Sequence, residues 1–452
     1  MNRKNNILAM RTNLSKISPI RAVGRVCGVA GGVVVIDGLG TQACIGDRVT
    51  VTREDAEPLK GEVVQLADGA VTMLPDGELD GVALGDRVTV QNAATVAPSS
   101  NWIGRIIDPD GHPLDGQPLH GGLTPRALRA PPPAPAERRA MGERLPTGLA
   151  AFNTVLPIVT GQRIGLFAGS GVGKSSLLGH LAQHMQADVV VIAMIGERGR
   201  ELRHFVDEVL GQDGLKRSVV VAATSDQSAL VRRRCAWTAM AVAEHFRDQG
   251  KSVLFLADSI TRFAEAHREV AVAAGEAPVL RGHPPSTSHL IMSLCERAGP
   301  GAEGQGDITG VFSVLVAGSD MDEPVADVLR GVLDGHVVLD RSIAERGRYP
   351  AIDLLKSVSR SLPAAASKQE NELIQATRKI LSVYERNEMM ITAGLYAQGS
   401  DPEIDMAIQL WPEIEEHLAK VDEQGIENSF DRLSLIMRRA QIKKPQVPVR
   451  RH

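Results

Sequence analysis

Residues 164–181 read Ile-Gly-Leu-Phe-Ala-Gly-Ser-Gly-Val-Gly-Lys-Ser-Ser-Leu-Leu-Gly-His-Leu, and this stretch decides the fold. Its apolar start predicts a buried strand, its closely spaced glycines predict a loop with unusual φ and ψ angles, and its leucines begin a helical stripe. A strand, a glycine-rich loop, Lys-Ser and a helix together form the context of a phosphate-binding loop. The predicted nucleotide-binding residues of this loop are Gly169, Ser170, Gly171, Val172, Gly173, Lys174, Ser175 and Ser176.

Two side chains of this loop carry its chemistry. The backbone N–H groups and the helix N-terminus would hold phosphates, and Lys174 would reach the terminal ones. The hydroxyl group of Ser175 would bind Mg²⁺. Ala168 stands where the usual spacing has its first glycine, a change that many such loops accept. The alternative, a glycine-rich turn with a surface lysine, fits the flanking strand and helix poorly.

The composition limits the class of protein. A length of 452 residues predicts about three domains, and a hydrophobic content of 43% is ample for their cores. No apolar run approaches the ~18 residues that span a bilayer, and the polar N-terminus lacks a secretory pattern. Four scattered cysteines favour reduced thiols and a cytoplasmic protein. A net charge of −4 and an aromatic content of 3% argue against a nucleic-acid partner.

A β-rich domain is predicted for residues 20–92. Short runs rich in Val alternate with Gly-Asp turns, which is typical of a small β-barrel. The stretch Gly46-Asp-Arg-Val-Thr-Val51 recurs as Gly85-Asp-Arg-Val-Thr-Val90. We interpret this repeat as two similar strand entries and not as a binding motif.

An α/β pattern follows in residues 93–362, which begin with a linker. Residues 102–107 indicate a strand near the start of this linker, and residues 189–195, 218–223 and 253–258 indicate buried strands in the α/β domain. Asp258 ends the last of these, in the form of a Walker B strand whose acid orients water ligands of Mg²⁺. Glu197 ends another, at the edge where open α/β sheets bind ligands, and could activate water for hydrolysis. A solvated turn of mixed charge is the alternative for residues 196–201.

Several motifs in a fixed order make the chain resemble a known family. In addition to the phosphate loop, they are Gly196-Glu-Arg-Gly-Arg-Glu201, Ala257-Asp-Ser-Ile-Thr-Arg-Phe-Ala264, Gly282-His-Pro-Pro-Ser286, Tyr349-Pro-Ala-Ile-Asp353 and Ser357-Val-Ser-Arg360. Together they resemble the catalytic subunits of rotary ATP synthases and their secretion relatives, over nearly the whole chain. The resemblance implies a RecA-like ATPase domain over residues 93–362, with a leading linker. Residues 310–327, 333–340 and 399–402 most resemble the flagellum-specific export ATPase, with the injectisome ATPase of virulence secretion second.

The resemblance implies a role for each matching residue. Glu197 matches the catalytic carboxylate, and Asp258 matches the acid that orients Mg²⁺ during ATP hydrolysis. Tyr349 matches an aromatic residue that packs on adenine, with a core tyrosine as the alternative. Arg198 and Arg262 match phosphate-sensing residues. Arg360 matches the arginine finger that reaches the site of the neighbouring subunit. The chain departs from the family pattern at Ala168, Gly199 and His283.

Helical segments are predicted at both ends of the chain. Residues 1–19 carry an apolar stripe among basic residues, as in a helix that docks on a partner or an anionic membrane, or they form a tail. Residues 363–452 form a C-terminal helical domain whose apolar stripes are core first, and Leu433, Leu435 and Ile436 close it. We interpret the basic tail that begins at Arg438 as a solvated end.

The resemblance also implies an assembly and its partners. It implies a homohexameric ring, cytoplasmic and peripheral to the inner-membrane export apparatus. The implied partners are a stalk-like regulator, a central stalk-like protein, export chaperones with their cargo, and the membrane export gate. Two alternatives remain: an RNA or DNA translocase of the transcription-terminator type, and a ring subunit that binds nucleotide without hydrolysis. Residues 20–92 contain only six Lys and Arg residues and no aromatic residue, which argues against the translocase. Glu197 argues for turnover.

Overall fold

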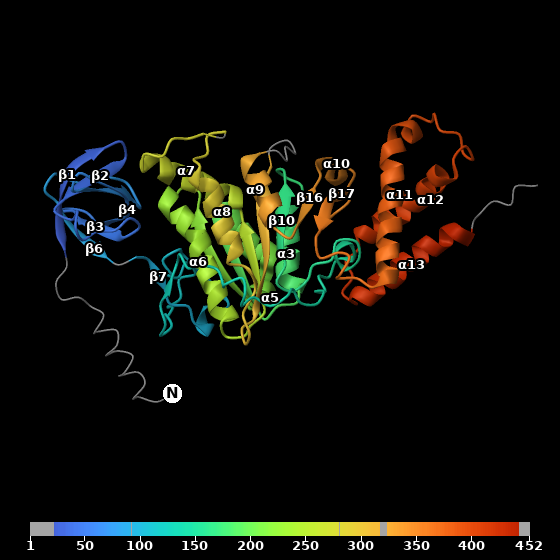
Figure 1. Cartoon of the computed structure of the whole chain (residues 1–452), viewed down its shortest axis with the longest axis horizontal. Coiled ribbons are helices and arrows are strands. Elements are labelled where there is room, and N and C mark those ends of the chain that lie inside the picture. Colours follow the sequence, from blue (N-terminus) through green and yellow to red (C-terminus); the bar gives the residue numbers. More distant parts are fainter. Residues whose placement is uncertain (1–21, 92, 280, 317–322, 443–452) are drawn as a thin grey trace, which may run out of the picture.

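The computed structural model describes residues 22–91, 93–279, 281–316 and 323–442. It confirms the predicted fold class: a β-barrel, an α/β domain and a helical domain follow one another in space as they do along the chain (Figure 1). The predicted amphipathic segment 1–19 and the end of the basic tail, residues 443–452, lie outside the described residues. Within the described ranges, no helix has the length and apolar character needed to cross a membrane.

The N-terminal barrel closes because its strands alternate between interior and surface positions. The order around the barrel is β1-β2-β5-β4-β3-β6, and neighbouring strands are antiparallel. Val49 and Val51 are fully buried at alternate positions of one strand and fill the interior with their counterparts. The strands are β1 (Val23–Ala30), β2 (Val33–Asp37), β3 (Arg48–Thr52), β4 (Leu59–Ala67), β5 (Ala70–Pro75) and β6 (Arg87–Gln91).

The sequence repeat of the barrel forms two equivalent strand entries, as predicted. β3 and β6 pair antiparallel with Thr50 opposite Thr89, so the two copies of the repeat pair with each other about that point. In each preceding turn the aspartate side chain, of Asp47 or Asp86, accepts a 2.8 Å hydrogen bond from the backbone N–H three residues earlier. The repeat therefore builds two copies of one turn at opposite ends of a strand pair.

The central domain is organised around a sheet of nine strands, ordered β17-β16-β10-β15-β13-β11-β12-β8, with β14 paired to β15. All neighbours from β16 to β8 are parallel, whereas β17 and β14 are antiparallel to their partners. The carboxyl ends of the parallel strands therefore meet at one edge of the sheet. The strands are β8 (Arg105–Ile107), β10 (Arg163–Ala168), β11 (Val189–Glu197), β12 (Ser218–Thr224), β13 (Val253–Asp258), β14 (Gly299–Pro300), β15 (Asp307–Leu315), β16 (Gly335–Leu339) and β17 (Ile352–Ser359).

Helices cover both faces of this sheet, since successive strand side chains point to opposite faces. In β11, Val190 and Ile192 belong to the core beneath α3, whereas Val191 and Ala193 belong to the core beneath α6. The helical segments are α2 (Ala150–Asn153), α3 (Lys174–His184), α4 (Gly199–His204), the π-helical η2 (Phe205–Leu210), α5 (Gly211–Leu215), α6 (Ala229–Arg247), α7 (Ile260–Ala273), α8 (Ser286–Glu296), α9 (Pro324–Val332) and α10 (Arg341–Glu345).

The connection between barrel and ATPase core differs in part from the prediction. The strand expected over residues 102–107 is shorter, because residues 100–102 form the 3₁₀ turn η1 (Ser100–Trp102) and only β8 (Arg105–Ile107) is extended. Trp102 is buried in the core of the α/β domain, and β8 pairs with β12 at the edge of the sheet. The two short strands β7 (Thr95–Val96) and β9 (Arg126–Ala127) also pair. Much of this segment therefore belongs to the α/β domain.

The C-terminal domain packs three helices, α11 (Lys368–Thr392), α12 (Pro402–Leu418) and α13 (Ile426–Ile442). Ser367 and Glu370 form a capping box at the start of α11, and the Asp401 side chain caps α12. Leu433 is fully buried, as expected, but the expectation for Leu435 is wrong because its side chain is 55% exposed. Two residues along a helix point to different sides, so Leu435 faces away from the core that Leu433 fills.

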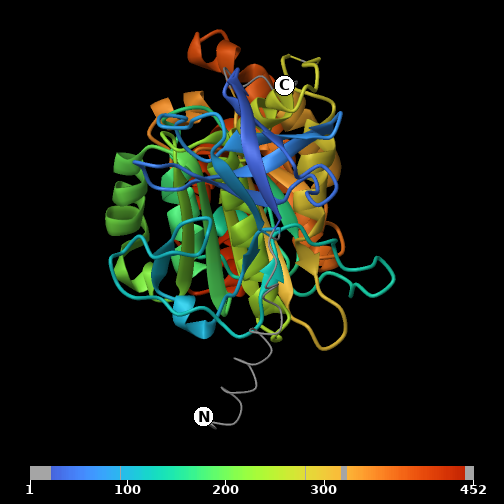
Figure 2. The ribbon, with the colours of Figure 1, turned by 90° about the vertical axis from the view of Figure 1, so that its left-hand side faces the viewer.

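The two domain junctions have different chemistry. The barrel, in front of the central domain in Figure 2, contacts it through buried ion pairs. Arg234 of α6 lies 3.0 Å from Asp76 of the barrel, and Arg233 lies 2.9 Å from Glu62. The helical domain instead shares one continuous apolar core with the α/β domain, in which Leu410 and Phe152 both take part. The helical domain is thus joined to the nucleotide-binding domain by one shared apolar core, whereas the barrel is joined to it by buried ion pairs and a small apolar cluster that includes Val64 and Leu230.

Candidate functional site

The glycine-rich loop lies where β10 ends and α3 begins. Gly171 has φ of +77° and Gly173 has φ of +88°, conformations that favour glycine. The expectation of an unusual angle at Gly169 is wrong: its φ is not positive, and an added Cβ would meet Val316 O at an ordinary 3.7 Å. The first N–H groups of α3 have no partner within the helix and point toward this loop. The loop therefore presents backbone donors at the carboxyl edge of the sheet.

Lys174 of this loop contacts the acid of the predicted Walker B strand. Its Nζ atom donates to Oδ1 of Asp258, which ends β13 and is 2% exposed. The Oγ of Ser313 on the neighbouring strand β15 donates to the same Asp258 oxygen at 2.7 Å. The lysine and the carboxylate, 84 residues apart in the chain, thus meet at one point, as predicted.

Glu197 is brought to the same place from the end of β11. One of its carboxylate oxygens lies 3.9 Å from Lys174 Nζ, and its side chain is 16% exposed. Burial raises the pKa of Glu197 to about 7, and the negative charge of Asp258 adds to this effect while Lys174 opposes it. A carboxyl group with a pKa near neutrality accepts a proton readily at physiological pH, which is the property that a general base requires.

Two arginines flank Glu197 at different depths. Arg198 is exposed and lies 3.9 Å from Glu201. Arg262 on α7 donates to Glu265 at 2.8 Å, and its side chain packs beside Gly196, where an added Cβ would lie 3.4 Å away. Arg198 thus follows Glu197 directly, Arg262 packs beside the residue that precedes Glu197, and both arginines make local ion pairs.

Tyr349 also lies at this edge. Its ring faces the phosphate loop, because a Cβ added at Gly173 would meet the ring at 3.2 Å. The ring is 51% exposed, so the alternative of a core tyrosine is wrong. Gly173 is needed both for its positive φ and for this close approach.

Arg360 lies at the opposite edge of the sheet. It follows β17, whose last residue, Ser359, pairs with Gly335 at the start of β16, and the Arg360 Nη2 donates to Arg330 O at 2.9 Å. The side chain is exposed. The two edges are roughly 20 Å apart, since the six residues of β10 rise about 3.3 Å each. Arg360 is thus separated from the Lys174 of its own chain by the length of the sheet.

Comparisons with known proteins agree with this geometry. The nucleotide-binding domain of the ATP synthase alpha/beta family matches residues 148–359, and the C-terminal domain of the type III secretion ATPase EscN matches residues 366–434. The flagellum-specific ATP synthase of Caulobacter vibrioides is 44% identical over 94% of this chain and 98% of its own length. The chain belongs to the ATP synthase alpha/beta family, among the flagellum-specific ATP synthases.

Further relatives support the same placement. The flagellum-specific ATP synthase of Salmonella typhimurium is 41% identical over 94% of this chain and 95% of its own length. The solved structure of the assembled ATPase EscN, from the type III secretion system of enteropathogenic E. coli, is 34% identical, with a TM-score of 0.84 over 91% of this chain and 99% of that chain. The higher identity to the flagellar relatives favours the flagellar branch over the injectisome.

The oxygen donors of this ATPase fit Mg²⁺, the cation with which the family uses nucleotide. Mg²⁺ prefers one or two carboxylates together with phosphates and water over a cage made only of protein ligands. The described residues contain no cluster of three or more metal-ligating His, Cys, Asp or Glu side chains, but they place the Asp258 carboxylate beside Lys174 and put Ser175 in the first turn of α3. The donor set therefore suits a metal that arrives with the nucleotide.

Sequence reasoning missed Ser313 as a member of this ATPase site. The sequence indicates Ser313 only as a serine within the apolar run of β15, and this run does not show which strands lie next to β15. The structure places β15 between β10 and β13, so that Ser313 faces Asp258. Residues 317–322, which follow β15 at the same edge, lie outside the described part of the chain.

Proposed function

We propose that the chain hydrolyses MgATP at the carboxyl edge of its central sheet, and that hydrolysis drives or regulates export of flagellar proteins. The observation that carries the proposal is the meeting of Lys174, Glu197 and Asp258 at the ends of β10, β11 and β13. A base with a pKa near 7, a lysine on a phosphate loop and an acid after a buried strand form the set that ATP hydrolysis requires.

Each residue has a part in this proposal. Lys174 and the loop N–H groups bind the phosphates and hold the terminal one in line with water. Glu197 accepts a proton from that water as it attacks. Mg²⁺, when bound, neutralises charge on the phosphate oxygens; Ser175 would hold it directly and Asp258 would hold it through water.

The arginines and the tyrosine complete the proposed site. Arg262 and Arg198 respond to the terminal phosphate, which requires each to exchange its local acidic partner for phosphate oxygens. The half-exposed ring of Tyr349 packs on the adenine base. Arg360 supplies its guanidinium to the nucleotide of the neighbouring subunit, where it offsets charge on the transferred phosphoryl group.

An active site shared between subunits implies a ring. A head-to-tail interface that closes on itself gives a cyclic oligomer, for which we propose six copies. A related ATPase is known in assembled form and in complex with its central stalk EscO, at 35% identity and a TM-score of 0.82 over 91% of this chain. By analogy we propose a central stalk-like partner here, together with a stalk-like regulator, export chaperones with cargo, and the membrane export gate. The proposed location is the cytoplasmic side of the inner membrane.

The test is the conversion of Glu197 to Gln, which keeps the size and hydrogen bonding of the side chain and removes the base. We expect turnover to fall by about 10²–10⁴ while ATP binding persists, because the loop and Lys174 are unchanged. Steady-state phosphate release and nucleotide titration measure the two effects. Glu208→Gln, which changes an exposed glutamate of η2 outside this site, is the control. Near-normal turnover of the Glu197 variant would exclude Glu197 as the base.

A further inference from the structure

The segment between α10 and β17 lies between the phosphate loop and the helical domain. Tyr349 of this segment faces Gly173 of the loop. Two arginines of the same segment, Arg346 and Arg348, reach into the helical domain on the other side. The four consecutive residues 346–349 thus contact the nucleotide site on one side and α11 and α12 on the other.

Arg348 is the more deeply held of the two arginines. Its Nε lies 2.9 Å from a carboxylate oxygen of Glu415 on α12, and its Nη2 donates to the Ile352 carbonyl at 2.8 Å. The Arg348 side chain is 9% exposed and that of Glu415 is 17% exposed. Burial raises the pKa of Glu415, which the positive charge of Arg348 opposes. The pair is therefore largely withdrawn from solvent, in contrast to surface ion pairs that contribute little.

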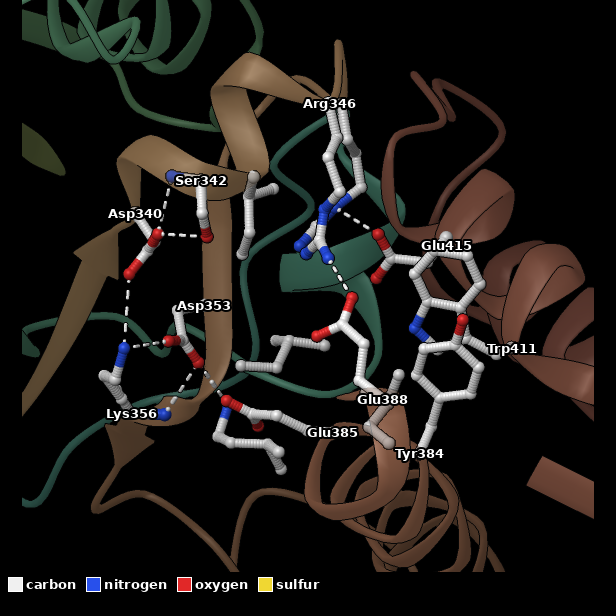
Figure 3. A pocket seen from close by; sticks show the side chains of 15 residues that line it. Asp340, Ser342, Arg346, Asp353, Lys356, Tyr384, Glu385, Glu388, Trp411 and Glu415 are labelled. Carbon is white, nitrogen blue, oxygen red and sulfur yellow. Dashed lines mark hydrogen bonds and ion pairs between the residues drawn. The ribbon is translucent and has the colours of Figure 1, made fainter. Parts of the chain in front are cut away.

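Arg346 makes a second, more open contact with the same domain. Its Nη1 donates to Glu388 of α11 at 2.8 Å, and its guanidinium lies 5.8 Å from the ring centre of Trp411 on α12. The Trp411 ring is stacked on Tyr384 at 4.4 Å. Figure 3 shows Arg346, Glu388 and Glu415 converging in a pocket bounded by these two aromatic rings. The chain just before Tyr349 is thus attached to two helices at once.

We propose that Arg348 is a positioning residue for nucleotide binding, and that its ion pair with Glu415 holds the Tyr349 ring over the phosphate loop. The inference rests on the proposed function, in which Tyr349 contacts the adenine base. It assigns a task to the helical domain that the residues of the phosphate site do not reveal: α12 fixes the direction of the base-binding side chain.

The physical reason is the cost of ordering a half-exposed ring. Tyr349 is 51% exposed, so packing against its own chain holds it only partly. Its neighbour Arg348 fixes the backbone at that point because the guanidinium is tied to Glu415 and to Ile352 O. If that tie is lost, the ring must be ordered when the base binds, and the affinity for ATP falls by about three- to ten-fold. Ligands that lack the adenine base should bind with unchanged affinity.

The experiment compares MgATP with magnesium tripolyphosphate, which has the phosphates and lacks the base. Dissociation constants for both are measured by calorimetry on the full chain for Arg348→Lys, Glu415→Gln and Tyr349→Ala. We expect all three variants to weaken the binding of MgATP by about three- to ten-fold and to leave the affinity for tripolyphosphate unchanged. In steady state, KM for ATP should rise while kcat stays the same. Arg348→Lys keeps the charge beside Glu415 but cannot make both contacts of the guanidinium, to Glu415 and to Ile352 O, so it tests the tie even if Glu415→Gln folds poorly.

Glu413→Gln is the matched control. Glu413 lies on the same helix and pairs with Arg439 at 3.0 Å, and this pair is far more exposed than that of Arg348 and Glu415. The control should change the affinity for neither ligand. Equal losses for the two ligands in the Arg348 and Glu415 variants would show general damage and overturn the inference, as would no loss for either. If only Tyr349→Ala discriminates between the ligands, the base contact stands and the positioning role falls. If Tyr349→Ala does not discriminate, the proposed base contact fails and the positioning role fails with it.

Discussion

The two edges of the central sheet differ in how far each is organised within a single chain. At the carboxyl edge, Lys174 lies beside both Glu197 and Asp258, and all three side chains are largely buried. At the amino edge, Arg360 is exposed and contacts only a backbone carbonyl of Arg330 among the hydrogen bonds described for its side chain. One edge is thus an assembled site, and the other presents a cation to solvent.

This difference tells us where subunits must meet. A strand of six residues separates the two edges, which is too far for Arg360 to contact a phosphate bound by its own Lys174. The arginine can act on a nucleotide only if a second copy brings its carboxyl edge to this surface. The contrast therefore predicts that one edge functions as a binding site in each chain and the other functions only in an assembly.

The largest expected effect is at the amino edge. Arg360→Ala should lower turnover by about 10³–10⁵ because the charge on the transferred phosphoryl group loses its partner, while ATP binding stays normal. An ATPase assay with parallel nucleotide titration measures both quantities. Arg341→Ala removes an exposed arginine of the same domain, paired with Glu345 at 2.9 Å, and should leave turnover unchanged.

Mixing variants separates action between subunits from action within one. Arg360→Ala has an intact phosphate loop, and Lys174→Ala has an intact finger, so rings that contain both should recover part of the activity. The measurement is turnover across mixing ratios, with ring formation followed by light scattering. No recovery in verified mixed rings, or full activity in a dilute monomer, would contradict the prediction that Arg360 acts on the nucleotide of a neighbouring subunit.

A smaller effect is expected for the metal at the carboxyl edge. Asp258→Asn keeps the shape of the side chain and removes the charge that orients water around Mg²⁺. We expect the Mg²⁺ concentration needed for half-maximal turnover to rise by about 10–100-fold. A titration of activity against free Mg²⁺ measures this, and Asp248→Asn, at the far end of α6, is a control. An unchanged Mg²⁺ requirement would remove Asp258 from the metal site.

The pH dependence of turnover tests the carboxyl edge by itself. The pKa of Glu197 is raised to about 7 by burial, and the active form of a base is the deprotonated one. Activity should therefore be lost as pH falls through 7, with kcat/KM decreasing about ten-fold per pH unit below it. The residual activity of Glu197→Gln should lack this dependence. A variant that keeps the same acid limb would assign the limb to another group.

The smallest effect on nucleotide binding is expected at the N-terminus. Deletion of residues 1–18 should leave ATP binding by the single chain unchanged, because the carboxyl edge is complete without them. Binding to the stalk-like regulator or to anionic liposomes should be lost, since the basic apolar stripe would provide that contact. Pull-down and liposome flotation measure it. Unchanged binding after truncation would assign these residues to a tail.

The sequence by itself determined the elements that carry the chemistry. The strand, loop and helix around Lys174 are specified locally, because glycine spacing and apolar periodicity act over a few residues. The predicted strand over residues 253–258 matches β13, whose bounds are Val253–Asp258. The repeated Gly-Asp-Arg-Val stretch likewise marked two strands of the barrel.

Only the tertiary structure decided which of these elements are neighbours. The order β10-β15-β13-β11 puts Ser313 against Asp258 and brings Glu197 within 3.9 Å of Lys174, although no local pattern records that order. The antiparallel direction of β17 separates Tyr349 and Arg360, eleven residues apart, to opposite edges of the sheet. The link from Arg348 to Glu415 likewise depends on how α12 packs. Periodicity reports which face of an element is buried, whereas long-range packing selects the element that covers it.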